Sequence, residues 1–143
     1  MKNVSFLLIV LLPDIAAHAY DPNEKVLKAF TETFTHAENV KWEEYPDYYT
    51  VSFKTGAIQS KVIYNTEGVM LGAIRYYLPE LLPLHILNSV KKEYKNKKPY
   101  CVTEVTRNNV LNYFIKLEDD NFWYSIQVTA SGNSTIIETY RKG

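Results

Sequence analysis

The residues of this chain that could carry covalent chemistry are few and lie far apart in the sequence. Cys101 is the only cysteine, and a cysteine nucleophile needs a base held against it. His36 is expected just after a helix and His85 near the start of another, which are positions typical of surface or capping residues. No catalytic triad is therefore predicted, and whether Cys101 is a buried or a reactive thiol stays open.

Two acidic groups, Glu43-Glu44 and Glu118-Asp119-Asp120, are the other candidates for chemistry. Paired carboxylates can hydrolyse glycosidic bonds, so a small hydrolase is one alternative for the function. Both groups fall at predicted strand ends or turns, where solvated acids are common. Residues 119–121 lack the glycine and distal glutamate of an EF-hand, and the sequence has no closely spaced zinc ligands and no glycine-rich phosphate loop. We predict no cofactor and no metal.

The elements that must position these residues begin with an amphipathic helix. Asp21 is predicted as its N-cap and Pro22 as its first residue, and an apolar stripe then runs from Val26 to Phe34. The helix is expected to end between residues 35 and 39. Alternating apolar and polar residues then predict strands around 40–43, 49–54, 58–64 and 69–77.

The same order of elements follows a second time. Pro83 starts a predicted helix with apolar residues up to Tyr94, and strands are predicted around 100–106, 111–118, 122–129 and 135–141. The two halves match 64 residues apart: Tyr49, Val51 and Phe53 align with Tyr113, Ile115 and Leu117.

This repeat predicts an α+β fold, in which a unit of one helix and four antiparallel strands occurs in tandem. The units cover about residues 21–77 and 78–142 of a single domain, residues 20–143. Joined at their edges, they give one curved sheet of about eight strands with both helices on one face. The strands 69–77 and 135–141 are the expected edges, and pairing there leaves a homodimer open.

The face without helices is the candidate binding surface. Phe114 and Trp123 fall on it, although large aromatic residues are costly to expose to water. A covering loop or a dimer partner is the alternative explanation for them. The neighbouring polar candidates are Gln59, Lys61 and Lys116. Tyr45 and Tyr48, in the turn before residue 49, are a second candidate surface, or else they cap the rim of the core.

Residues 1–19 have the pattern of an export signal. Lys2 is followed by the apolar run 4–12 and by the small residues of Ala17-His18-Ala19, so cleavage is expected after Ala19. We therefore predict a periplasmic or secreted protein without membrane insertion. The formal net charge of zero argues against a nucleic-acid partner.

Several motifs together resemble a known family of small exported bacterial proteins of the Bacteroides type. They are Val26-x-x-Ala29-Phe30-x-x-x-Phe34, Val40-x-Trp42, Tyr49-x-Val51-x-Phe53 and Tyr64-x-x-x-Gly68, with Leu82-Pro83 opening the second repeat. The family is the PepSY-like family, also called β-lactamase-inhibitor-like. The resemblance implies the tandem fold with one curved sheet. It also implies inhibition of an enzyme as one possible function, but no residue of this chain can be matched to an inhibitory residue of the family.

Together these patterns predict a non-enzymatic exported binding protein that engages a protein or peptide through its open sheet face, as an inhibitor or regulator. A small-molecule or glycan binder that uses the concavity of the sheet is the alternative within the binding class.

Overall fold

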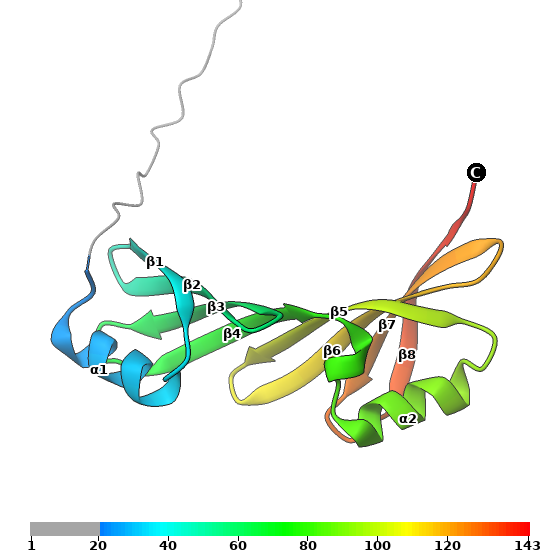
Figure 1. The fold of residues 1–143 in the computed structure, drawn as a ribbon, viewed down its shortest axis with the longest axis horizontal. Coiled ribbons are helices and arrows are strands. Elements are labelled where there is room, and N and C mark those ends of the chain that lie inside the picture. The colour runs from blue at the N-terminus through cyan, green and yellow to red at the C-terminus, as the bar shows by residue number, and fades with distance from the viewer. Residues whose placement is uncertain (1–20) are drawn as a thin grey trace, which may run out of the picture.

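The computed structural model describes residues 21–143, so the predicted export signal lies outside the described residues. Two helices, one short 3-10 turn and eight strands follow in an order that is nearly the same twice (Figure 1). The first unit consists of α1 (Glu24–Thr33), β1 (Glu38–Glu44), β2 (Tyr48–Thr55), β3 (Ile58–Asn65) and β4 (Met70–Tyr77). The second consists of η1 (Pro79–Leu81), α2 (Leu84–Glu93), β5 (Lys98–Arg107), β6 (Val110–Glu118), β7 (Phe122–Thr129) and β8 (Ser134–Arg141).

The eight strands form one antiparallel sheet in sequence order, from β1 at one edge to β8 at the other. This confirms the predicted α+β fold and the single sheet. The prediction that residues 69–77 form an edge was wrong, because β4 pairs along Gly72–Tyr77 with β5, and β1 is the second edge instead. The two units are thus joined by a continuous ladder of backbone hydrogen bonds.

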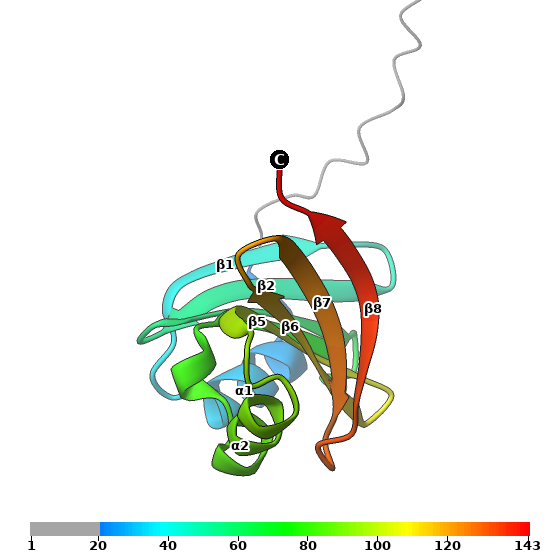
Figure 2. The same ribbon diagram turned by 90° about the vertical axis from the view of Figure 1, so that its right-hand side faces the viewer.

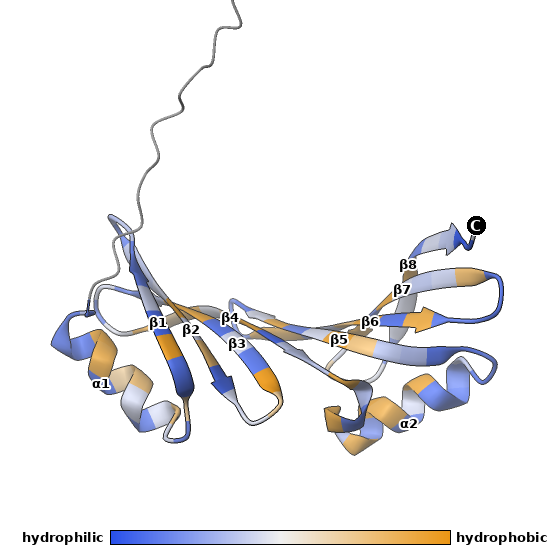
Figure 3. Ribbon diagram, turned by 45° about the horizontal axis from the view of Figure 1, so that its top comes forward, coloured by the Kyte–Doolittle hydropathy of each residue, from blue (hydrophilic) through white to orange (hydrophobic). Residues whose placement is uncertain are grey.

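Both helices cover the same face of the sheet, as predicted. Figures 1 and 2 show them below the sheet, one under each unit, and Figure 3 shows the two ends of the sheet rising on the opposite side. Each helix buries its own core. Val26 and Phe30 of α1 pack on β2 and β3, whereas Ile86 and Val90 of α2 pack on β5 to β7. The face opposite the helices is therefore open and lies on the inner side of the curve.

The start of α1 differs from the prediction. Asn23, not Asp21, is the N-cap: its side chain accepts a hydrogen bond from the backbone N–H of Val26 at 3.0 Å. The Asn23 amide also donates to the carbonyl of Thr66 at 2.9 Å, which ties the helix to the β3–β4 turn. Asparagine caps a helix as well as aspartate does, so the additional hydrogen bond from Asn23 to Thr66 explains why the helix is capped at Asn23 and not at Asp21. The helix ends at Thr33, earlier than expected.

The repeated glycines, Gly68 and Gly132, lie where each helix meets a turn of the sheet. Their φ angles are +83° and +94°, in the left-handed region that favours glycine. A Cβ on Gly68 would lie 2.7 Å from the carbonyl oxygen of Lys25, and one on Gly132 would lie 3.1 Å from Oγ of Ser89. Lys25 and Ser89 are themselves 64 residues apart, so the duplication has kept one helix–turn contact in both units.

A buried ion pair marks the junction of the two units on the helix-covered face. Glu104 of β5 accepts a hydrogen bond from the hydroxyl of Tyr77 at 2.5 Å and pairs with Arg75 of β4 at 3.0 Å. Only 11% of the Glu104 side chain is exposed, whereas Arg75 reaches solvent. A carboxylate this deeply buried needs such partners, so these contacts fix the register of β4 against β5.

Candidate binding face

An apolar band crosses the open face diagonally, and we call it the open-face stripe. Pairing registers place its members on neighbouring strands and on the same face, since paired residues point the same way and strands lie about 4.8 Å apart. The stripe consists of Tyr48 (β2), Ile63 (β3), Ile74 and Tyr76 (β4), Val105 (β5) and Phe114 (β6). It spans both repeats and crosses the junction between them.

The stripe is hollowed at its centre, where Gly72 has no side chain. The depression has a volume of about 580 Å³, and Tyr48, Ile63, Ile74 and Val105 contribute to its walls. Arg107 lies on its rim, and among residues 21–143 it has no carboxylate within ion-pair distance. An apolar hollow with a cationic rim can receive a large apolar side chain of a partner.

Phe114 and Trp123 both lie on the open face but are not brought together. Phe114 is opposite Thr103 and Gln127, next to the apolar centre, and is half-buried. Trp123 lies two residue rows away beside Tyr140, with 43% of its surface exposed and Lys142 over its ring at 5.5 Å. The row between them is polar, so the two aromatic residues form separate patches.

The predicted lysines form two polar clusters along one side of the stripe. Lys61 pairs with Glu43 at 3.4 Å, and Thr50 donates to the same carboxylate at 2.9 Å. The hydrogen bond from Thr50 and the charge of Lys61 lower the pKa of Glu43, although its partial burial opposes them. Lys116 donates to the Ser125 hydroxyl and lies 3.9 Å from Glu138. Both lysines are thus held in defined places by the sheet.

The remaining predicted residues adjoin the same stripe. Gln59 is opposite Tyr76, and its amide donates to the carbonyl of Phe53 at 3.2 Å. Tyr45 stacks on Tyr48 with ring centroids 4.5 Å apart and planes 12° apart. Since Tyr48 lines the central depression, the tyrosine turn is continuous with the open-face stripe.

Sequence reasoning missed the central part of the stripe. Ile74, Tyr76 and Val105 belong to β4 and β5, whose faces were not assigned from the sequence. Alternation within residues 69–77 and 100–106 was the available signal. This alternation identifies a binding surface only if β4 and β5 are known to be neighbours, because only then do both strands lie at the centre of the sheet.

The acidic groups do not have the geometry of a hydrolase. Glu43 points to the open face, whereas Glu44 accepts a hydrogen bond from the Tyr49 hydroxyl on the helix-covered face at 3.2 Å. Adjacent residues of a strand point to opposite sides, so these two carboxylates cannot converge on one substrate bond. The pKa of Glu43 is also lowered, whereas a general acid needs a raised pKa.

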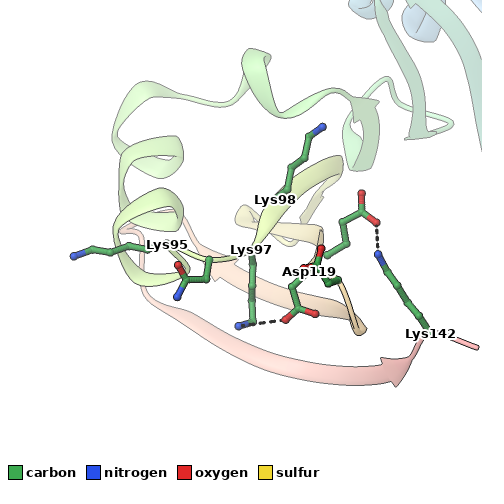
Figure 4. A pocket seen from close by; sticks show the side chains of 8 residues that line it. Lys95, Lys97, Lys98, Asp119 and Lys142 are labelled. Carbon is green, nitrogen blue, oxygen red and sulfur yellow. Dashed lines mark hydrogen bonds and ion pairs between the residues drawn. The ribbon is translucent and has the colours of Figure 1, made fainter.

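The second acidic group borders a charged hollow of about 490 Å³ at the end of the second unit (Figure 4). Asp119 accepts hydrogen bonds from the Tyr124 hydroxyl at 2.7 Å and from two backbone N–H groups of its own turn, and these lower its pKa. Glu118 pairs with Lys142 at 2.8 Å, which lowers the pKa of Glu118. Lys95 points away from these pairs (Figure 4). Lys97 also lies 3.9 Å from Asp119, so Glu118 and Asp119 are both engaged in ion pairs within the chain.

Cys101 lies on the open face opposite Lys116 and is half-buried. Burial raises the pKa of its thiol, although the charge of Lys116 acts in the opposite direction. His36 is hydrogen-bonded to Thr35 and His85 to the carbonyl of Ala130, so both imidazoles are engaged elsewhere. The hydrogen bonds of both imidazoles are made to other groups, and the raised pKa of the Cys101 thiol disfavours its thiolate form.

Within residues 21–143, no group of three His, Cys, Asp or Glu residues lies close enough to hold a metal ion. In the same range, neither helix has the length and apolar character needed to cross a membrane.

Comparison with known proteins places this geometry among a set of solved structures from Bacteroides. No family model and no curated protein matches the sequence. A DUF2874 family protein from Bacteroides ovatus is 21% identical, with a TM-score of 0.59 over 85% of this chain and 89% of that chain. A BLIP-like protein from Bacteroides fragilis is 15% identical, with a TM-score of 0.61 over 87% and 90%.

A third structure, from Bacteroides eggerthii and provisionally described as periplasmic, is 15% identical with a TM-score of 0.58 over 85% and 90%. These matches cover nearly the whole folded part of each chain, and none of them bears on the PepSY-like part of the resemblance. The chain has the fold shared by the BLIP-like and DUF2874 proteins of Bacteroides.

Proposed function

We propose that this chain is a non-enzymatic, exported binding protein that engages a protein or peptide partner through the open-face stripe. The observation that carries the proposal is the stripe itself. An apolar band on the concave side of a sheet is costly to leave in water, and Tyr76 at its centre is 49% exposed. Aromatic and aliphatic residues surrounded by fixed charges are typical of protein interfaces.

The layout of the stripe favours a macromolecular partner. It runs over five strands, from Tyr48 on β2 to Phe114 on β6, which is longer than a compact small molecule covers. Lys61 and Lys116, each paired with a carboxylate, border the stripe on one side, and Arg107 borders it on the other, as polar rim residues do around the apolar centre of an interface.

The fold comparison supports the same class of function. One structural neighbour is BLIP-like, that is, similar to a β-lactamase inhibitor protein, and another is provisionally described as periplasmic. Our proposal therefore includes inhibition of an enzyme as one outcome of binding. It also places the protein in the periplasm, the compartment that fits the export pattern of residues 1–19.

Site-specific photocrosslinking tests the proposal. A photoreactive amino acid replaces Tyr76 in one variant, and in a matched control it replaces Lys28, which is exposed on the outer side of α1. Both proteins are irradiated in a periplasmic extract, and the adducts are identified by mass spectrometry. We expect an adduct that is specific to position 76, competed by the unlabelled protein but not by a folded Phe114→Ala variant.

The same protein adducts from positions 76 and 28 would show that the stripe has no special role. A small-molecule ligand is the second candidate, because a volume of about 580 Å³ lies within the range of ligand sites. Native mass spectrometry of the protein purified from its host distinguishes this case: a retained low-mass ligand that is absent from a Gly72→Val variant would replace the protein partner in our proposal.

A further inference from the structure

The outer edge of β8 is the unpaired counterpart of an edge that is paired inside the molecule. β8 (Ser134–Arg141) and β4 (Met70–Tyr77) are related by the 64-residue repeat over their full length. In the first unit, the outer edge of β4 receives β5 as an antiparallel neighbour, in a ladder from Gly72↔Arg107 to Tyr77↔Val102. The outer edge of the fourth strand therefore pairs with a neighbouring strand in the first unit, whereas the equivalent edge is unpaired in the second.

The side chains of β8 do not protect this edge. Ile136 and Ile137 are 46% and 47% exposed, and they replace Gly72 and Ala73 of β4. Ile137 is the extra residue of a bulge against β7, so it is left outside the β7–β8 ladder. Exposed β-branched residues on an open edge favour pairing with another strand.

The other edge of the sheet is protected in the usual way. β1 carries the charged residues Glu38, Lys41, Glu43 and Glu44 within seven positions, and Asn39 interrupts it with a φ of +54°. Both edge strands contain a bulge, so the difference between them lies in their charged side chains, which are a device by which natural sheets prevent edge pairing. β8 has only Glu138 and Arg141, and Glu138 lies 3.9 Å from Lys116 of its own sheet. The two edges therefore differ in what they can accept.

We propose that β8 pairs in antiparallel fashion with β8 of a second copy of this chain, across a two-fold axis near Ile137. In this register Thr135 is opposite Tyr140, and both point to the open face, since their partners in β7 are Gln127 and Trp123. An antiparallel neighbour must match faces in this way, and a two-fold contact must be complementary to itself.

The other positions satisfy the same conditions. Ile136 is opposite Thr139, and both point to the helix-covered face, as their β7 partners Ile126 and Tyr124 do. Arg141 is opposite Ser134, and Glu138 is opposite Ile137, so no like charges are paired directly. A second copy of β8 therefore fits this edge with its faces matched, and each Glu138 beside the axis has Lys116 of its own sheet as a counter-charge at 3.9 Å.

The dimer has a consequence for the open face. The two sheets become one continuous sheet of sixteen strands, and their two open-face stripes lie on the same side. Two linked sites raise the effective affinity for a partner that presents two copies of its epitope. The proposal does not depend on that partner, because it rests on the edge of β8 alone.

Sedimentation velocity of the purified protein between roughly 1 μM and 1 mM tests the proposal. We expect a monomer–dimer equilibrium within this range for the wild type. Ile137→Asp places a carboxylate opposite Glu138 of the second copy and should leave only monomer, because like charges directly opposite each other destabilise a strand pair, while Val40→Asp, at an exposed position of the other edge, should leave the dimer unchanged. Circular dichroism confirms that both variants are folded.

Hydrogen exchange keeps the test decisive if Ile137→Asp does not fold. Backbone amides of residues 134–141 in the wild type should gain protection as the concentration rises, whereas those of β1 should not. A monomer at every concentration would overturn the proposal. Species larger than a dimer that grow with concentration would also overturn it, because they would indicate pairing of β8 with β1 in a chain of copies.

Discussion

Two buried tyrosines should respond in opposite ways to the loss of their hydroxyl groups. Tyr77 and Tyr64 are 6% and 1% exposed, and both point to the helix-covered face. The Tyr77 hydroxyl donates to the Glu104 carboxylate at 2.5 Å. The Tyr64 hydroxyl is buried and has no hydrogen-bond partner among the described residues. The same substitution therefore removes a satisfied group from the core under α2 at Tyr77 and an unsatisfied group from the core under α1 at Tyr64.

The magnitudes follow from these contacts. A hydrogen bond to a charged group contributes about 1.5–3 kcal/mol, so Tyr77→Phe should lower the free energy of unfolding by roughly 2 kcal/mol, because Arg75 remains to neutralise Glu104. A buried hydroxyl without a partner costs about 1–3 kcal/mol. Tyr64→Phe should therefore be neutral or stabilise the protein by about 1 kcal/mol.

Urea unfolding followed by tryptophan fluorescence measures both values. With an m-value of about 2 kcal/mol/M, Tyr77→Phe should lower the midpoint by about 1 M, while Tyr64→Phe should leave it unchanged or raise it. Tyr113→Phe is the matched control, since this buried tyrosine makes no hydroxyl hydrogen bond to any residue between 21 and 143. Equal destabilisation by Tyr77→Phe and Tyr64→Phe would refute the reasoning.

The pH dependence of Tyr64→Phe gives an independent check. Burial raises the pKa of Tyr64 to about 12 from its ordinary value of 10.0. Because the folded-state pKa is raised, the contribution of Tyr64 to stability is present below pH 10 and is lost as the pH rises toward 12, while the unfolded chain ionises first. At about pH 11 the wild type should have lost about 1.4 kcal/mol that Tyr64→Phe does not lose.

Three further perturbations have defined outcomes. Gly68→Ala should lower the free energy of unfolding by more than about 2 kcal/mol, because its Cβ would both strain a left-handed backbone and meet the backbone of α1 at 2.7 Å. Gly56→Ala is the control: open space surrounds its Cβ, so only the left-handed strain of about 1–2 kcal/mol applies. Thermal unfolding compares the two variants. Asp119→Asn should reduce the loss of stability in acid, since a lowered carboxylate pKa gives stability above pH 3.8 that disappears as the pH falls through the folded-state pKa; an unchanged acid titration would contradict this. Cys101 should react with iodoacetamide more slowly than a free cysteine at pH 8, because burial raises its pKa, and a rate equal to that of free cysteine would contradict the structure.

Most of the scaffold could be predicted from the sequence, because it depends on local patterns. The alternation around Val51 and Ile115 identified the buried face, and the two units were visible in the 64-residue period. The N-cap was wrong by two residues because Asn23 is selected by its contact with Thr66, 43 positions away. Local capping rules contain no information about such a contact.

The binding face was only partly accessible to sequence reasoning. Phe114 and Tyr48 were identified by alternation and composition, and they lie at the two ends of the stripe. The centre of the stripe at Ile74 and Val105 depends on the pairing of β4 with β5. The sequence alone does not determine which edge of one unit pairs with which edge of the other. The separation of Trp123 from Phe114 likewise depends on register, since one row of residues decides which side chains are neighbours.

The direct test of the open-face stripe is the dissociation constant of the partner identified by crosslinking at position 76. The double variant Tyr76→Ala/Phe114→Ala removes two aromatic side chains from the stripe, one at its centre and one at its end. Leu84→Ala removes an apolar side chain that is 71% exposed on α2, on the other face. We expect at least a roughly tenfold weaker affinity for the double variant, because each hot-spot aromatic contributes about 1 kcal/mol or more, and no change for Leu84→Ala. Unchanged affinity of the double variant, with weaker binding by Leu84→Ala, would contradict the account and place the interface on the helix-covered face.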